Sequence, residues 1–368
     1  MKEPAIIKKI FNGVVIYLYD TKFGIHGKLR NAQDGTRERE PAFMSVFKRE
    51  LKPGMLLVDI GANIGYHSLW AASVVGKDGA VIAFEPDSRN FKLLVMGVEG
   101  NAFTNVEVYA MAVSDKVAGK QPFYLAKASN LSSMQQSART TEQIFVDTTT
   151  LSNFFLGRVK PPDFVKMDIE GHEVEVLRGA RAMFSEYFQC KLLIEVHPQF
   201  LNGKDFEEEL RYLLEKGFTT KYVITAGVAR PDAFVEHGYE PDEVFDCGRF
   251  ERGLYTGVSN EDMLAFACYP IKQEVPSAGE VSPKIVRAVM LERSVTGGGS
   301  QVDDPPDEDT SESAPPNEII IETHAEGAMK HTKKKRPPKQ RKRDSKTLDR
   351  PPVDRSMHSD DSKSVVKK

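Results

Sequence analysis

Short apolar runs and helix-spaced apolar positions alternate along the middle of the chain. Residues 55–60 (MLLVDI) form an apolar run that ends at Gly61, which is typical of a strand buried on both faces. Residues 66–75 then carry apolar side chains at helical spacing, which predicts a helix. The same alternation adds strands at 80–84 and 106–113. Because strands alternate with helices, the pattern favours an α/β domain built on a parallel sheet.

The later part of the pattern contains one interruption. Residues 121–151 hold two strand-like segments around a Ser-rich loop, an insertion that we expect over the mouth of the sheet. Further helices are predicted at 172–187 and 206–216, and further strands at 164–169, 192–196, 218–225 and 264–269. We therefore predict a Rossmann-like, doubly wound sheet of about seven mostly parallel strands with helices on both faces.

Aromatic residues end at Tyr269, which leaves the last 99 residues without Phe, Trp or Tyr. Because such a segment lacks the best core-forming side chains, we expect residues 271–368 to be a disordered, low-complexity tail. It carries an acidic block at 301–312 and a basic block at 330–343. The predicted organisation is a strand-rich N-terminal extension (1–37), one globular domain (38–270) and this tail.

Charge and cysteine content exclude several classes of protein. The 50 Lys and Arg residues nearly balance the 53 Asp and Glu residues, so there is no global bias toward nucleic acid or acidic membranes. The three cysteines have no metal-binding spacing, and no apolar stretch approaches the roughly 18–20 residues that span a bilayer. We expect a cytoplasmic protein, or a nuclear one if the basic block acts as a targeting signal. That block has no aromatic residue for base stacking, so any contact with nucleic acid or an acidic surface would be weak.

A glycine-containing loop follows the first strand of the pattern. In residues 58–65 (VDIGANIG), Gly61 and Gly65 permit a tight turn, and the helix that follows offers unpaired N–H groups. Glu85 ends the second strand twenty residues after Gly65, where a carboxylate accepts hydrogen bonds from ribose hydroxyls. Together these residues predict a site for a nucleoside cofactor.

The loop departs from the dinucleotide-binding fingerprint GxGxxG, which binds a pyrophosphate. Its spacing is Gly61-x-Asn63-x-Gly65, without a third glycine at the expected place. S-adenosylmethionine has no phosphate, and a loop with Asn63 and a preceding carboxylate, Asp59, suits its amino-acid end better. A glycine turn that serves packing alone is the competing interpretation.

Five ordered motifs resemble the FkbM-type methyltransferase family. They are VDIGANIGYHSL (58–69), AFEPD (83–87), NV with AVS (105–106 and 112–114), VKMDIEGHEVEVLRGA (165–180) and LLIEVHP (192–198). The resemblance spans residues 38–225. It implies a class I methyltransferase fold and an S-adenosylmethionine-dependent enzyme that methylates a hydroxyl of a sugar, lipid or small metabolite.

The resemblance also assigns cofactor-binding residues. It implies that Glu85 holds the ribose, that Ala112 and Val113 flank the adenine, and that Ser132, with Ser133, closes over the cofactor. The methionine part would be lined by four residues of the first motif, Asp59, Gly61, Asn63 and Gly65. Glu40 is a further contact on the same basis.

Titratable side chains follow two later strands. Asp168 and Glu170 alternate so that both face one side at the carboxyl edge of the sheet, where open sheets bind ligands. Methyl transfer to an alcohol requires an aligned oxygen and help in removing its proton. Either carboxylate could be that base or orient the acceptor, and a salt-bridged structural role is the alternative. His197 titrates near neutrality and is a third catalytic candidate.

Other interpretations of these residues stay open. A divalent metal held by Asp168, Glu170, Glu195 and His197 lacks a clear ligand spacing, so we predict no metal. An RNA ribose 2′-O-methyltransferase would combine the acids Asp168 and Glu195 with Lys166 and Lys191, although the lysine positions match poorly. A methyltransferase fold that binds the cofactor without turnover and acts as a scaffold is the third hypothesis.

Overall fold

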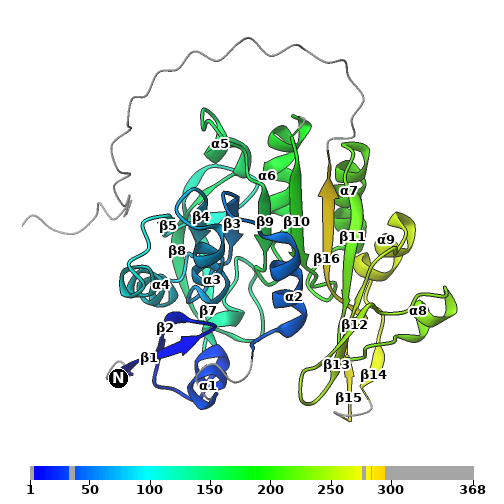
Figure 1. Ribbon diagram of the computed structural model, residues 1–368, viewed down its shortest axis with the longest axis horizontal. Helices are drawn as coiled ribbons and strands as arrows, with labels where there is room; N and C mark the ends of the chain where they lie inside the picture. Colours follow the sequence, from blue (N-terminus) through cyan, green and yellow to red (C-terminus); the bar gives the residue numbers. More distant parts are fainter. Residues whose placement is uncertain (1–3, 33–37, 187, 276–278, 283, 295–368) are drawn as a thin grey trace, which may run out of the picture. The chain divides into compact units, whose positions relative to one another are not determined.

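The computed structural model describes residues 4–32, 38–186, 188–275, 279–282 and 284–294 (Figure 1). All of these residues belong to one compact unit. The acidic and basic blocks lie outside the described residues. In the described part of the chain, no helix combines the length and the apolar character that crossing a membrane requires.

A nine-stranded sheet forms the centre of this unit, in the order β12-β13-β11-β16-β10-β9-β3-β4-β5. Every strand runs in the same direction except β13 and β16. The strands are β3 (Leu56–Ile60), β4 (Ala80–Phe84), β5 (Val106–Tyr109), β9 (Phe164–Met167), β10 (Cys190–Glu195), β11 (Thr219–Thr225), β12 (Glu243–Asp246), β13 (Glu251–Tyr255) and β16 (Val286–Arg293). The prediction of a mostly parallel α/β sheet is confirmed, with more strands than the seven expected.

The far end of the sheet differs from the prediction. Residues 264–269, expected to be a strand, belong mainly to helix α9 (Asn260–Cys268). The strand next to β10 is instead β16, which pairs antiparallel with both β10 and β11 and lies between them in Figure 1. The domain therefore extends past residue 270 to at least Arg293. Lack of aromatic residues misled the prediction, because the apolar side chains that this strand buries are all non-aromatic.

Helices cover both faces of the sheet, as predicted. One apolar core packs strand residues such as Val58 and Val165 against the helices α5 (Leu151–Phe155), α6 (Glu173–Ser185), α7 (Gly203–Glu215), α8 (Asp232–Glu236) and α9. The other packs the alternate strand residues, such as Leu57 and Phe164, against α1 (Gly24–Asn31), α2 (Pro41–Glu50), α3 (Tyr66–Val75) and α4 (Ser88–Gly100). Successive strand residues thus enter opposite cores, which is why these strands are apolar throughout.

Three smaller β structures flank the main sheet. The N-terminal hairpin of β1 (Ile6–Phe11) and β2 (Val14–Tyr19) packs on α3 and α4 and shares their core. The predicted insertion forms β7 (Ala118–Ala126) and β8 (Thr140–Thr149), which join β6 (Ala112–Val113) in a separate sheet. The predicted strand at 106–113 is thereby divided between β5 and β6. A third pair, β14 (Gln273–Val275) with β15 (Glu280–Ser282), lies near the end of the described chain.

The insertion is tied to helix α1 across the carboxyl end of the sheet. The short 3-10 helix at Ser129–Leu131 lies between β7 and β8, and the Ile25 N–H donates to Asn130 Oδ1 (3.1 Å). Ser129 Oγ also lies 3.2 Å from His26 Nε2. Segments about a hundred residues apart therefore meet over the sheet edge where ligands bind in open α/β folds.

Candidate active site

The glycine loop lies where the strand order reverses, because β3 has β4 on one side and β9 on the other. Gly61 directly follows β3 with φ +79°, and a Cβ there would come within 2.2 Å of the Asp168 carbonyl oxygen. The N–H groups of Gly61 and Ala62 both donate to the Phe84 carbonyl (3.0 Å each). Only glycine fits this contact, so the loop is held against the ends of both neighbouring strands.

Glu85 is fixed by the same loop. Its Oε2 accepts the Asn63 N–H (2.7 Å) and its Oε1 accepts the Asp87 N–H (2.9 Å). Burial, with the nearby Asp87 charge, raises the pKa of Glu85 to about 8. Asn63 has φ +55°, a strained value for a residue with a side chain, and this conformation aims its N–H at Glu85. The carboxylate is thus held in one orientation at the end of β4.

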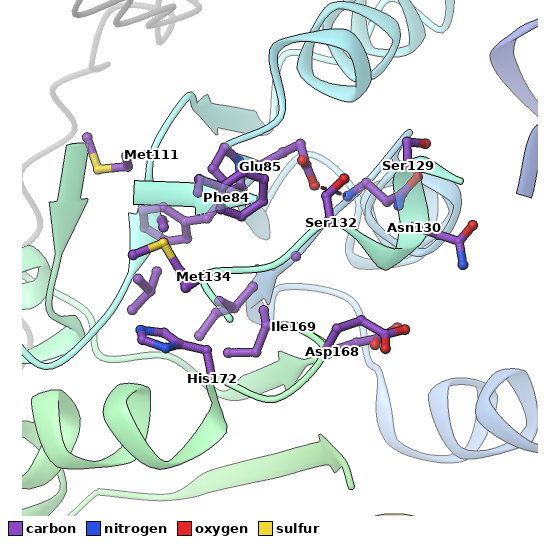
Figure 2. A pocket seen from close by; sticks show the side chains of 18 residues that line it. Phe84, Glu85, Met111, Ser129, Asn130, Ser132, Met134, Asp168, Ile169 and His172 are labelled. Carbon is purple, nitrogen blue, oxygen red and sulfur yellow. Dashed lines mark hydrogen bonds between the residues drawn. The ribbon is translucent and has the colours of Figure 1, made fainter. Parts of the chain in front are cut away.

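Glu85 forms part of the wall of a hollow of about 520 Å³, counting the space open to solvent. We call it the inner hollow (Figure 2). The predicted residues in its wall are Gly61, Asn63, Glu85, Ala112, Val113, Ser132, Asp168 and Glu170. Figure 2 shows Phe84, Met111 and Met134 toward one end and Asp168 with Asn130 toward the other. The hollow therefore has an apolar end and a polar end.

Two predicted cofactor residues do not line any of the hollows in the described chain. Asp59 is fully buried, pairs with Lys166 Nζ (2.9 Å) and accepts a hydrogen bond from Ser68 Oγ (2.6 Å). Lys166 also donates to the Gly61 carbonyl (3.1 Å), so Asp59 supports the loop from behind. Gly65 precedes α3, and a Cβ there would lie 2.5 Å from Leu94. Both residues shape the loop without facing the space it encloses.

Asp168 is the carboxylate most open to the hollows. It lines the inner hollow and also a second one, the middle hollow, whose wall includes Glu40, Tyr66, His67 and Arg287. No hydrogen bond or ion pair of its side chain is found within the described residues. Burial and the charge of Glu195 raise its pKa to about 7, although Lys166 opposes the shift. A carboxylate with this pKa exchanges a proton near neutrality.

Glu170 lies beside Asp168 with a left-handed backbone, φ +54°. Ser133 Oγ donates to its carbonyl oxygen (2.9 Å), which ties the inserted loop to this strained turn. Its carboxylate faces His197 Nε2 at 3.6 Å, and burial raises its pKa. Glu170 is therefore a wall residue of the hollows and also part of a buried ionic network.

His197 is enclosed in that network rather than open to a ligand. It is 2% exposed, with Nδ1 2.8 Å from Glu173 Oε1 and Nε2 3.0 Å from Glu195 Oε1. These two carboxylates outweigh the effect of burial and raise the pKa of His197 to about 10. An imidazolium has no lone pair to accept a proton, so the geometry does not support His197 as a general base.

Asp168, Glu170 and His197 place possible ligand atoms within 4.8 Å of one another. A metal ion requires neutral imidazole, whereas Nδ1 of His197 faces Glu173 and its Nε2 faces Glu195 and Glu170. Arg287 also pairs with Glu195. Because these carboxylates keep His197 protonated, with its pKa raised to about 10, the donor set does not fit a metal ion.

A third hollow, of about 1300 Å³ including space open to solvent, adjoins the middle one. We call it the outer hollow. It shares Arg39, Glu40, Asn130, Glu170 and Arg287 with the middle hollow. Its arginines were missed by the sequence analysis, because residues 39, 252 and 287 are far apart in the chain and belong to no motif. The wall of the inner hollow also contains His172 and Met111. Both could have been predicted from the sequence, because each lies close to a predicted residue.

The fold and this site together define a Rossmann-like α/β domain with a hollow at its switch point. Residues 59–220 match the family model for the methyltransferase FkbM domain. Over these residues, the resemblance seen in the five motifs is confirmed.

Two curated relatives each match just under half of the chain. It is 29% identical to the hexuronic acid methyltransferase AglP of Haloferax volcanii over 168 residues, 45% of this chain and 64% of that protein. It is 27% identical to Methyltransferase 1 of Beauveria bassiana over 198 residues, 48% of this chain and 74% of that protein. The match thus spans less than two thirds of the first relative.

Solved structures give weaker likenesses. A precorrin-6y C5,15-methyltransferase from Geobacter metallireducens has a TM-score of 0.35 at 10% identity, covering 74% of this chain and all of that one. A SAM-dependent O-methyltransferase from Thermotoga maritima scores 0.32 at 10% identity, with coverages of 81% and 80%. Scores this low carry no argument, so the fold class rests on the strand order described above.

Proposed function

We propose that this protein is an S-adenosylmethionine-dependent methyltransferase that transfers a methyl group to an oxygen of its acceptor. The observation that carries the proposal is the pair of carboxylates in one hollow: Glu85, fixed by two N–H groups, and Asp168, whose side chain is unpaired. Both lie within the segment that matches the FkbM methyltransferase domain.

The inner hollow fits the proposed cofactor. Apolar side chains at one end, among them Met111, Val113 and Met134, suit an adenine ring. Glu85 would accept hydrogen bonds from the ribose hydroxyls. These would replace the hydrogen bonds to water that its carboxyl group loses on burial. Glu40 lines the middle hollow, and neighbouring Arg39, His67 and Arg287 lower its pKa to about 2, so it stays ionised and would hold the ammonium group.

The cofactor, when bound, supplies a methyl group on a positively charged sulfur. Asp168 would orient the acceptor hydroxyl and take its proton as the carbon–oxygen bond forms and the carbon–sulfur bond breaks. A general base of this kind contributes about 10²–10⁴-fold to the rate. Asp168 suits this role because its side chain is free and its pKa is near 7.

The acceptor we propose is sugar-related. AglP, 29% identical over 168 residues, is named a hexuronic acid methyltransferase. An RNA acceptor is not favoured by the geometry. Lys166 lies in the wall of the middle hollow, but its Nζ is held by Asp59 and the Gly61 carbonyl. Lys191 pairs with Glu50 Oε2 (2.7 Å) and lines none of the three hollows, so the lysine pair that an RNA ribose methyltransferase would require is not assembled there.

Calorimetric titration of the full-length protein with S-adenosylmethionine tests the cofactor, with NAD as the control. We expect saturable binding of the methyl donor and none of NAD. Transfer of labelled methyl groups to a panel of sugars then tests the reaction. Tight cofactor binding without product on any acceptor would favour the non-catalytic scaffold, and absence of cofactor binding would contradict the proposal.

A further inference from the structure

Arg252, on β13, is a buried cation without a partner. It is 9% exposed, and its guanidinium makes no ion pair or hydrogen bond within the described residues. Its Nε is fully buried and unsatisfied. The guanidinium carbon lies over the ring of Phe250, 5.0 Å from its centroid. A buried guanidinium without a partner is costly, so its retention in a hollow needs an explanation.

The other charged groups of the outer hollow do not supply that partner. Its four carboxylates are each engaged elsewhere: Glu38 with Lys48, Glu40 with Arg39, Glu170 with His197, and Asp246 with the Gly248 N–H. Arg287 is paired with Glu195 and Glu40. Lys28, exposed at the rim, also has no ion pair within the described residues. Arg252 and Lys28 are therefore the cations in this wall that have no ion pair within the described residues.

We infer that the outer hollow is an acceptor subsite that binds an anionic group of the substrate through Arg252, with Lys28 at its rim. The planar guanidinium donates two parallel N–H groups, which match the two oxygens of a carboxylate or phosphate. This inference rests on the proposed function and narrows its acceptor to an acidic sugar.

The walls of the hollows support a continuous path from Arg252 to the proposed base. The outer and middle hollows share Glu40, Asn130 and Arg287, and the middle hollow includes Asp168. An acceptor whose acidic group contacts Arg252 can thus present a hydroxyl near Asp168. Binding the anion would also position that hydroxyl, since one end of the sugar is fixed.

Calorimetric titration of the full-length protein with D-glucuronate, D-glucose 6-phosphate and D-glucose tests the subsite. We expect saturable binding of at least one acidic sugar and at least tenfold weaker binding of glucose. The acidic sugar that binds better distinguishes a carboxylate from a phosphate ligand. Equal affinity for all three sugars, or no binding of either acid, would overturn the inference.

Variants separate Arg252 from general charge effects. Arg252→Gln should weaken binding of the acidic sugar at least tenfold. Arg252→Lys should have an intermediate effect, because lysine keeps the charge but lacks the two parallel N–H groups of the guanidinium. Arg230→Gln is the matched control, because Arg230 pairs with Glu240 on the surface and lines none of the hollows. Unchanged affinity in Arg252→Gln would contradict the assignment.

A stability measurement distinguishes a ligand-binding role from a structural one. Because Arg252 has no partner, Arg252→Met should keep or raise the melting temperature, whereas a structural guanidinium would lower it when removed. The sugar titrations need no methyl donor. Binding of acidic sugars without binding of S-adenosylmethionine would therefore refute the proposed function and leave the subsite standing.

Discussion

The buried charges of the site fall into two groups. In the first, Asp59 pairs with Lys166, and His197 lies between Glu173 and Glu195. In the second, Asp168 and Arg252 have no charged partner within the described residues, and Glu85 accepts N–H groups from Asn63 and Asp87 without an ion pair. Pairing stabilises the first group, whereas the second is left with capacity for a ligand. We expect paired charges to govern stability and unpaired ones to govern binding and turnover.

The largest expected effect is on turnover. Asp168→Asn should reduce kcat about 10²–10⁴-fold, because the amide cannot accept the proton. In the wild type, kcat/KM should fall as the pH drops below about 7, since protonated Asp168 is inactive. Methyl transfer measured across pH tests both points.

The matched change in the first group is Asp59→Asn. It leaves Lys166 buried without its carboxylate partner, so the free energy of unfolding should fall by about 3–5 kcal/mol. Equal stability of the Asp59 and Asp168 variants in urea denaturation would remove the distinction between the two groups.

Removing the His197 imidazolium from its network of carboxylates should lower the free energy of unfolding by a similar amount. His197→Gln leaves Glu173 and Glu195 with less positive charge, and we expect a loss of about 3–5 kcal/mol at neutral pH. The pKa of His197 is raised to about 10, so its contribution is complete below pH 6.5 and is lost as the pH rises through 10. Denaturation of both proteins at pH 6 and pH 10 should show the difference shrinking at the higher pH.

One added methyl group should disrupt the backbone contact between the glycine loop and the residue that follows β9. Gly61→Ala adds a Cβ against the Asp168 carbonyl and strains a left-handed residue, so stability should fall by about 2–5 kcal/mol. Gly13→Ala is the control, because Gly13 has φ +80° but open space around it, and should cost about 1–2 kcal/mol. Similar losses in both variants would show that the close contact adds nothing.

The smallest effect is expected at Glu85. Glu85→Gln should weaken S-adenosylmethionine binding about tenfold, because Gln offers one acceptor oxygen in place of two. At pH 4.5 the variant should be slightly less stable than the wild type, because one of the two backbone N–H groups loses its acceptor. Because the pKa of Glu85 is raised to about 8, ionisation opposes folding increasingly between pH 4.5 and 8, so the variant should gain melting temperature relative to wild type over that range.

The sequence predicts the parts of the site that are local in the chain. The glycine loop, Glu85 and Asp168 each follow a buried strand directly, so a strand pattern places them at one edge of the sheet. Asp59 was placed in the site as the carboxylate just before the glycine loop. Its partner Lys166 comes from β9, and only the pairing of β3 with β9 shows that the two neutralise each other.

Contacts between distant segments escaped the sequence analysis. Arg252 and Arg287 approach Glu40 through a hairpin and a strand that no local pattern relates to the glycine loop. The role expected of His197 failed for a similar reason. An isolated histidine titrates near neutrality, but Glu173, on α6, contacts the His197 ring and changes its pKa.

The position of β16 has a consequence for how the chain folds during synthesis. Arg293 pairs opposite Cys190, so the sheet closes through contacts between residues about a hundred positions apart. Until the chain is made as far as β16, β10 and β11 each present an unpaired edge, which invites association with other chains. Such late, non-local pairing slows folding. A fragment that ends before Val286 would keep those edges permanently, even though it contains the whole segment that matches the FkbM domain.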